Sequence, residues 1–415
     1  MVEISLEEEL LPASGQVRLL QESFLLQLIR EDWPGTDHVR TRLRQLKLAP
    51  LAAEGLRLRF AAAELKLPAE GVSPAVRRRQ LAAGTWFQLV CREAAAGWKH
   101  IYPFVNEANP LQVFFVIPLK EGSGHADRTG RFLTELEQKL NAAVEQDCTV
   151  AVAAGLEIKG LKRLRNAFAS CLCNLDLNGR PGMGPGEADA AMPVMTWLSP
   201  EEERRLLQII ETADTFAFEQ ELTALFGAEK HSAGLSAAQL YQAVRLQLLL
   251  TVAAGKFAFR GTALCKYLWN SHAMLAACTS PAQLTEQLSA LGLLVMDEVK
   301  LARQSPERGL AEAVRKYIER NYGWELQPAA AAQLFGVEEG SLTRQFKQHV
   351  GIPFADYTVK IRMGRAEQLL PDEKLKLTDL APLVGYASLS HFVSAFKKYS
   401  GKSPKEFRER LQKSH

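Results

Sequence analysis

Two matching segments near the end of the chain contain the residues whose types and spacing suit a binding chemistry. They are LQPAAAAQLFGVEEGSLTRQFKQHVG (326–351) and LTDLAPLVGYASLSHFVSAFKKYSG (377–401). In each segment an Ala precedes a Gly by four positions, an apolar residue precedes a Phe by four, and another Gly follows that Phe by five. The turn after the first Gly is one residue longer in the second copy. Repeated spacing of this kind indicates two copies of one structural unit.

The repeated positions suit two short helices joined by a tight turn. A small Ala lets the second helix approach the first, and a Gly adopts the positive φ that ends the first helix. The apolar residue and the following Phe anchor the second helix in the core, so the polar residues between them face outward, toward a DNA groove. The anchors are Ala332, Gly336, Leu342 and Phe346 in the first copy, and Ala381, Gly385, Phe392 and Phe396 in the second.

An ordinary helical hairpin is the alternative interpretation of either copy alone, because any such hairpin can contain Ala, Gly and Phe. Two copies with matched spacing make that alternative weak. A long helix separates them, with apolar residues at helical spacing, namely Phe354, Tyr357, Ile361 and Leu369. We therefore interpret the two segments as a double helix-turn-helix domain that binds DNA.

Two further strings give this region a resemblance to a known family. They are IRMGRAEQLL (361–370), with Arg362 and Ala366 in an RxxxA pattern, and LVGYASLSHFVSAFKKYSGKSPKEFR (383–408). The region resembles the AraC/XylS regulators over about residues 308–412, a quarter of the chain. The resemblance implies two recognition helices, held by the linking helix in successive segments of the major groove.

The resemblance also implies which residues contact DNA. Those expected to contact base edges are Gly340, Ser341, Thr343 and Arg344 in the first recognition helix, and Leu389, Ser390, His391 and Ser394 in the second. Those expected to contact phosphates, and so to position the protein without recognising sequence, are Lys347, Lys397, Lys398 and Lys402.

The sequence departs from the family pattern at several positions. Ser394 stands where the family usually has Arg, which predicts weaker specificity in the second helix. Glu338 and Glu339 begin the first recognition helix, where they favour the helix dipole but repel phosphate. Pro382 is expected near the fourth position of its helix, where it removes one backbone hydrogen bond, and Gly364 softens the linking helix.

Charge is distributed in the direction that binding to nucleic acid predicts. The whole chain has a net charge of +3. From Glu307 to His415, 18 Lys and Arg stand against 13 Asp and Glu, which makes this part +5 and leaves −2 for the rest. The excess is small, so charge supports the interpretation without deciding it.

The remaining chain is long enough for further domains. We expect a multidomain protein of α+β and all-α parts. The predicted segments are an N-terminal helical segment (1–50), an α+β sandwich (51–177), a linker (178–198), a helical connector (199–305) and the DNA-binding domain (306–415). Residues 17–30 place Leu20, Phe24 and Leu28 on one helical face, which fits either a short coiled coil in a dimer or a helix packed on its own domain.

Residues 51–177 alternate strand and helix patterns in the order βαββαβα, a small ferredoxin-like sandwich. The strings FFVIPLKEG, CTVAVAAGLE and GLKRLRNAF weakly resemble the degenerate GGDEF-like domain of YesN-type regulators. The receiver domain of that group has no counterpart here. The hairpin FVNEANPLQVFF lacks paired glycines and holds a lone Glu107, so we do not expect an enzyme. The alternative is a nucleotide-binding or cyclase-like enzyme built on this domain.

Other residue types predict no further chemistry. Six cysteines lack metal-ligand spacing and resemble small apolar residues of a reducing compartment. Five histidines, His38, His100, His125, His231 and His272, are isolated in the sequence. Trp86, Trp98 and Tyr102 fit core packing better than a ligand pocket. We expect no cofactor and no metal.

The apolar runs are too short to span a membrane, and the acidic N-terminus differs from a signal peptide. We therefore expect a cytoplasmic regulator of transcription. Its expected partners are double-stranded DNA, a second copy of the chain in a homodimer, and RNA polymerase, with an effector that the sequence does not identify.

Overall fold

The computed structural model describes most of the chain in two compact units. The described residues are 15–30, 35–67, 74–106, 109–119, 125–143, 148–177, 200–226, 235–257, 262–304, 306–324, 326–373 and 375–413. The predicted linker 178–198 and Glu107 lie outside them. The first unit combines Met1–Phe24, Asp37–Ala52 and Leu310–His415, and the second combines Leu25–Thr36 and Ala53–Gly309.

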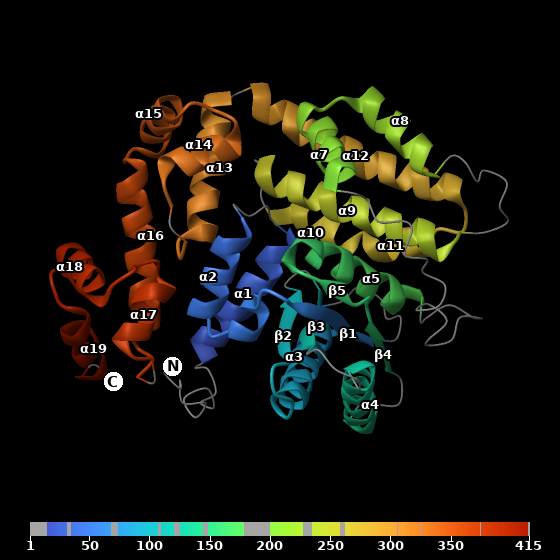
Figure 1. The fold of residues 1–415 in the computed structure, drawn as a ribbon, viewed down its shortest axis with the longest axis horizontal. Helices are drawn as coiled ribbons and strands as arrows, with labels where there is room; N and C mark the ends of the chain where they lie inside the picture. The colour runs from blue at the N-terminus through green and yellow to red at the C-terminus, as the bar shows by residue number, and fades with distance from the viewer. Residues whose placement is uncertain are drawn as a thin grey trace. The chain divides into compact units, whose positions relative to one another are not determined.

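The second unit contains a small antiparallel sheet in the order β2-β3-β1-β4, with a short β5 paired to β1 (Figure 1). Its strands are β1 (Arg57–Lys66), β2 (Tyr102–Asn106), β3 (Asn109–Leu119), β4 (Thr149–Ala154) and β5 (Ile158–Lys159), and its first helices are α3 (Pro74–Ala96), α4 (His125–Ala143) and α5 (Leu164–Leu177). Apart from β5, this is the βαββαβα order predicted from the sequence.

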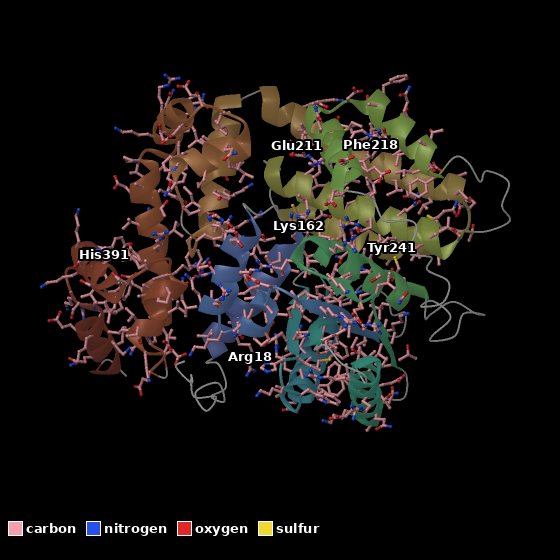
Figure 2. All side chains as sticks on the ribbon, in the orientation of Figure 1. Arg18, Lys162, Glu211, Phe218, Tyr241 and His391 are labelled. Carbon is pink, nitrogen blue, oxygen red and sulfur yellow. The ribbon has the colours of Figure 1, made fainter. Side chains whose placement is uncertain are left out.

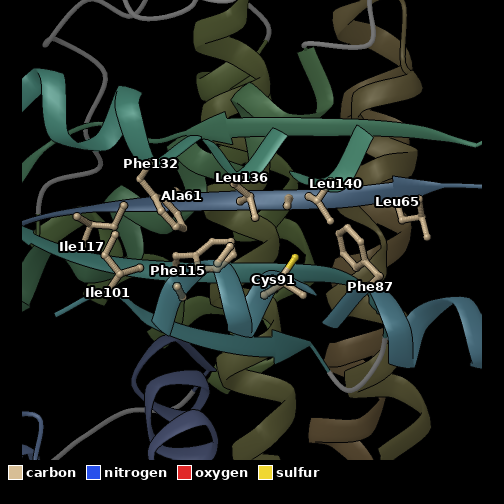
Figure 3. Packing of buried hydrophobic residues seen from close by; sticks show 14 of the residues in the cluster. Ala61, Leu65, Phe87, Cys91, Ile101, Phe115, Ile117, Phe132, Leu136 and Leu140 are labelled. Carbon is tan, nitrogen blue, oxygen red and sulfur yellow. The ribbon is translucent and has the colours of Figure 1, made fainter. Parts of the chain in front are cut away.

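Helices α3 and α4 cover one face of this sheet. Phe87 of α3 and Phe132, Leu136 and Leu140 of α4 are fully buried against Phe115 of β3 (Figure 3). The rings of Phe115 and Phe132 meet edge to face at 5.0 Å. Phe132, Leu136 and Leu140 follow one another at intervals of four residues, so they form one face of α4, which faces the core.

The other face of the sheet packs on α5. Phe168 of α5 lies 5.5 Å from Phe60 of β1 and 4.8 Å from Phe114 of β3, measured between ring centroids. The same ring stacks on Trp269 at 5.4 Å. Because Trp269 belongs to a helix of the all-α part, one continuous core joins the sheet to those helices.

The all-α part of this unit follows in sequence. Its helices are α7 (Pro200–Thr212), α8 (Thr215–Phe226), α9 (Ala237–Phe257), α10 (Thr262–Asn270), α11 (His272–Ala277) and α12 (Pro281–Gln304). Apolar residues at helical spacing in α9 and α12 are at most 1% exposed: Leu240, Val244, Leu248, Leu284, Leu288 and Leu291. The helical nature of this region is confirmed, and the separate limits predicted for its domains stay predictions.

The described residues of the first unit form helices and the segments that connect them. It contains the first part of α1 (Gly15–Arg30), α2 (Thr36–Gln45), the short 3-10 helix η2 (Ala49–Ala52), most of α13 (Pro306–Asn321), α14 (Pro328–Phe335), α15 (Glu339–Val350), α16 (Phe354–Leu369), α17 (Leu377–Leu383), α18 (Leu389–Ser400) and α19 (Pro404–Lys413). Phe24 of α1 packs against Trp324, with ring centroids 5.9 Å apart. The first part of α1 is therefore packed on its own chain, which is one of the two arrangements that its sequence allowed.

Candidate nucleic-acid interface

The first motif consists of α14, a three-residue turn and α15. Gly336 follows α14 with a φ of 65°, in the left-handed region that favours glycine. The carbonyl of Ala332 accepts a hydrogen bond from the N–H of Val337 at 3.0 Å, which closes the end of the helix. Ala332 itself is buried, as its proposed role in close helix packing requires.

The second motif repeats this geometry in α17 and α18. Gly385 has a φ of 89°, and the carbonyl of Ala381 accepts a hydrogen bond from the N–H of Tyr386 at 2.9 Å. Ala381 therefore matches Ala332 in both burial and hydrogen bonding. The helix α17 ends at Leu383, so one residue separates it from the glycine, whereas Gly336 follows α14 directly.

Pro382 differs in position from the prediction. It is the sixth residue of the seven-residue α17 rather than lying near the fourth. A proline at this position leaves the carbonyl of Thr378 without its helical donor. The short α17 therefore has fewer internal hydrogen bonds than a helix of its length normally makes.

The predicted anchors of both recognition helices are buried. Leu342 and Phe346 of α15 are at most 1% exposed, and Phe392 and Phe396 of α18 are fully buried. Phe346 packs on Phe354 of α16 and Phe396 on Phe407 of α19, with ring centroids 5.8 and 5.4 Å apart. Each recognition helix is thus fixed by its own aromatic anchor to the helix that follows it.

Each recognition helix also ends at the glycine that the repeat identified. Gly351 follows α15 with a φ of 88°, and Gly401 follows α18 with a φ of 75°. Their N–H groups donate to the carbonyls of Lys347 and Lys397 at 3.0 and 2.9 Å. The matched ends place Lys347 and Lys397 at corresponding positions in the last turn of each helix.

The linking helix α16 is tied to the chain that follows α13. Arg362 donates from Nε to the carbonyl of Tyr322 at 2.9 Å and from Nη2 to that of Trp324 at 2.7 Å. Arg408 of α19 makes the corresponding contacts to Leu370 and Leu375, both at 2.8 Å. In each motif, an arginine from the helix that follows the motif thus donates two hydrogen bonds to backbone carbonyls.

The residues predicted to contact bases in α15 do not all point freely outward. Arg344 and Gly340 are exposed. Thr343 is half-buried, and its Oγ1 donates to the carbonyl of Glu339 at 2.9 Å. Ser341 is also half-buried, and its Oγ accepts a hydrogen bond from Nε2 of Gln345 at 3.1 Å. Arg344 is therefore the best placed of the four to contact a base.

The four corresponding residues of α18 are all exposed: Leu389, Ser390, His391 and Ser394. Figure 2 labels His391 on α18. Leu389 is 36% exposed, and an apolar side chain at that position can contact a thymine methyl group. These four residues of α18 are therefore accessible, but apart from His391 their side chains are short or apolar.

The four lysines predicted to contact phosphate lie near the C-terminal ends of the recognition helices. Lys347, Lys397 and Lys398 are exposed, and Lys402 is half-buried. Glu406 lies near Lys397 and Lys402. Its pKa is lowered chiefly by hydrogen bonds from the backbone and side chain of Ser403, and to a smaller extent by these two lysines. Glu406 therefore offsets part of the positive charge beside α18.

Sequence reasoning missed Ser388 at the start of α18. Its Oγ accepts a hydrogen bond from the N–H of His391 at 3.3 Å and so caps the helix. Glu338 begins α15 without any such side-chain bond. A serine directly before a helix whose apolar residues recur every three to four positions is the usual signal for such a cap.

Other expectations concern residues outside this surface. Trp98 is half-buried and packs against the core, since its ring lies 5.9 Å from that of Phe132 and its Nε1 donates to Glu135 at 2.9 Å. His272 is buried and lies 3.1 Å from Asp176, so it is paired. No group of three or more potential metal ligands occurs among the described residues. None of the helices in the described ranges is long and apolar enough to cross a membrane.

Comparison with known proteins agrees with the geometry of the two motifs. Residues 331–410 match the family model described as a helix-turn-helix domain. The chain is 30% identical over 108 residues to the Msm operon regulatory protein of Streptococcus mutans, a match that covers 26% of this chain and 39% of that protein. It is 28% identical over 136 residues to the HTH-type transcriptional activator RhaS of an Enterobacter species, covering 31% and 48% of the two chains.

Among solved structures, the C-terminal domain of AraT, a response regulator from Geobacillus stearothermophilus, is 33% identical. It covers 24% of this chain and 84% of that one, with a TM-score of 0.24. The chain spans less than half the length of the two curated relatives named above. The helix-turn-helix match over residues 331–410 includes both recognition helices and α16 between them.

Proposed function

We propose that this chain is an AraC-type transcription regulator that binds double-stranded DNA through two recognition helices. One observation carries the proposal. The same helix–turn–helix geometry occurs twice, with matched hydrogen bonds at Ala332 and Ala381, buried aromatic anchors and polar side chains on the outer face of each recognition helix. The helix-turn-helix match over residues 331–410 and the similarity to named regulators support it.

Within this proposal, α15 and α18 occupy successive segments of the major groove. Gly340, Ser341, Thr343 and Arg344 of α15, and Leu389, Ser390, His391 and Ser394 of α18, face the bases. Arg344 has the chemistry for a bidentate contact with guanine. Because α18 carries no arginine on this face, the first half-site contributes most of the sequence specificity.

Lysines hold the protein to the DNA backbone in this proposal. Lys347, Lys397, Lys398 and Lys402 contact phosphates, and the net charge of the C-terminal part favours this association. Exposure of Lys347, Lys397 and Lys398, and their place at the ends of the recognition helices, supports the assignment.

The rest of the chain takes the role of a sensor and assembly part. We infer a homodimer in the cytoplasm that communicates with RNA polymerase, and a middle domain of degenerate GGDEF-like type without enzymatic activity. The order of strands β2-β3-β1-β4 with two helices on one face supports the ferredoxin-like sandwich on which such a domain is built.

The experiment that tests the proposal is selection of bound sites from a random DNA pool by the full-length chain. We expect a bipartite site whose halves are about one helical turn, or roughly 10 base pairs, apart. Log affinity should fall linearly with log salt, by roughly 0.9 for each phosphate neutralised. Failure to enrich any sequence, together with binding that is absent or indifferent to salt, would contradict the proposal.

A further inference from the structure

The N-terminal helix α2 contacts the second motif through one buried side chain. Arg42 donates from Nη1 to the carbonyl of Pro382 at 3.0 Å and from Nη2 to the carbonyl of Leu383 at 2.9 Å. The side chain belongs to the same compact unit as the motif, although about 340 positions of sequence separate them. Arg42 is only 6% exposed, so the contact is part of the core of the unit.

The two carbonyls belong to the last two residues of α17, beyond the reach of intrahelical N–H groups; that of Pro382 also accepts a hydrogen bond from the N–H of Gly385 at 3.1 Å. Arg42 supplies donors to both. A third hydrogen bond joins its Nη1 to Oε1 of Gln45 at 3.1 Å, so all three described partners of the guanidinium are neutral oxygens. Burial lowers the pKa of Arg42 to about 10; nearby Tyr322 opposes this shift, and Arg362 adds to it. The side chain stays charged at neutral pH and is held by carbonyl dipoles rather than by a carboxylate.

The space around this guanidinium is filled on the opposite side as well. A Cβ atom on Gly323 would overlap the guanidinium group of Arg42. A Cβ atom on Gly385 would lie 2.5 Å from the carbonyl oxygen of Tyr322 and 2.8 Å from Nε of Arg362. The turn of the second motif therefore packs closely on the segment that follows α13, with Arg42 inserted beside both.

Other contacts hold the N-terminal segment against the same region. Phe24 packs on Trp324, and Nζ of Lys47 lies 3.1 Å from Oδ2 of Asp379 in α17. Gln21 of α1 donates to the carbonyl of Leu46 at 2.7 Å, which joins α1 to the end of α2. The contact through Arg42 is thus the buried centre of a larger interface within the first unit.

We propose that Arg42 is a positioning residue for DNA binding by the second motif: it fixes the end of α17, and through it the direction of α18. The inference rests on the proposed function. A short α17 with an internal proline needs this support, because its own hydrogen bonds hold it weakly. Displacement of Arg42 therefore weakens recognition of the second half-site although none of the residues proposed to contact DNA is changed.

The test uses the full-length chain and two changes that remove the contact from opposite sides. Arg42→Met keeps an apolar stem of similar length and removes the donors. Gly323→Ala leaves Arg42 in the sequence but displaces the far end of its flexible side chain, and Gly323 has no positive φ that alanine would resist. Arg44→Met is the matched control, since Arg44 lies on the same helix and is exposed. Arg42→Lys keeps the charge with a compact donor group.

The measurement is affinity for the selected site and for versions with either half scrambled. Arg344→Ala and His391→Ala identify which half belongs to α15 and which to α18. We expect Arg42→Met and Gly323→Ala to reduce discrimination at the α18 half by roughly tenfold, the size of one lost bidentate contact. Discrimination at the α15 half should stay unchanged, Arg42→Lys should fall between, and Arg44→Met should match the unchanged chain.

Two results would overturn the inference. One is unchanged discrimination at the α18 half in Gly323→Ala and in whichever Arg42 variants fold. The other is an equal loss at both halves accompanied by a lower Tm, which indicates a general role in stability. Absence of any selected site for the unchanged chain contradicts the proposed function instead, so the two failures are distinguishable.

Discussion

The two motifs share a backbone geometry but differ in what supports them. The first motif lies in a core formed by its sequence neighbours, in which Val314 and Ile318 of α13 and Tyr357 of α16 surround Leu342 and Phe346. Its turn glycine, Gly336, has open space around the position of a Cβ atom, so only its positive φ requires glycine.

The second motif depends on segments from elsewhere in the chain. Gly385 requires both a positive φ and close approach to Tyr322, and the end of α17 is completed by Arg42. Arg362 from the linking helix lies over the ring of Tyr386, 5.3 Å from its centroid. Two copies of one motif can therefore have the same local shape while drawing their stability from different parts of the molecule.

The largest expected effects come from removing the aromatic anchors. Phe346→Ala and Phe396→Ala should each lower the free energy of unfolding by about 3–5 kcal/mol, because each leaves a cavity in a closed core. Denaturant unfolding of the full-length chain measures both. We expect Phe346→Ala to abolish recognition of the α15 half-site first and Phe396→Ala that of the α18 half-site. Identical loss at both half-sites for either change would show that the motifs do not behave as separate structural elements.

A smaller effect should separate the base-contacting side chain of α15 from the phosphate-contacting side chains of α18. Arg344→Ala should relax preference at one base position by about 1–3 kcal/mol and leave non-specific affinity nearly intact. Lys398→Ala should weaken binding to all sequences alike and reduce the salt slope by about one. Site selection and a salt titration for each variant test this comparison. An altered base preference in Lys398→Ala alone would place the two helices differently in the groove.

The two recognition helices also differ in their N-terminal caps, and this difference can be tested by removing the cap of α18 and adding one to α15. Ser388→Ala removes the cap of α18 and should cost about 0.5–2 kcal/mol of stability. Glu338→Ser introduces a capping residue where α15 has no side-chain cap, and should stabilise the chain by a comparable or smaller amount. Thermal unfolding of both variants provides the measurement. The interpretation fails if Ser388→Ala is neutral while Glu338→Ser is destabilising.

The smallest expected effect depends on pH and concerns the helix after the second motif. Hydrogen bonds from Ser403 lower the pKa of Glu406 in the folded chain. This contribution to stability is therefore present above the unfolded pKa of about 4.3 and is lost as pH falls through the lower folded pKa. Glu406→Gln should lower Tm at pH 7 and have no effect at pH values below the folded pKa. A difference that grows on acidification would have the wrong sign.

Most features of the two helix-turn-helix motifs could be predicted from local sequence. The positions of Ala332, Gly336 and Phe346, and of their counterparts in the second copy, reflect requirements that act within a few residues: small size, positive φ and burial one helical turn apart. The strand and helix order of residues 51–177 was predictable for the same reason, since hydrophobic periodicity is a local property.

Several features could not be predicted in this way. The sequence placed Thr343 and Ser341 on the outer face of α15 but could not show that both side chains are already engaged in hydrogen bonds within the helix. The sequence predicted Pro382 near the fourth position of its helix, whereas it is the sixth residue of α17. The prediction was wrong because the exact start of a short helix depends on packing that local patterns do not contain.

Residue types and their spacing are enough to locate two helix-turn-helix motifs, their turns and the side chains that anchor them. The burial of Arg42, a charged residue of an N-terminal helix, against the second motif becomes visible in the folded chain alone. An arginine is usually found at the surface, and its spacing along α2 carries no signal of a partner. Its role arises because folding brings it to the two carbonyls at the end of a short helix, and such pairing depends on distance in space rather than on position in the chain.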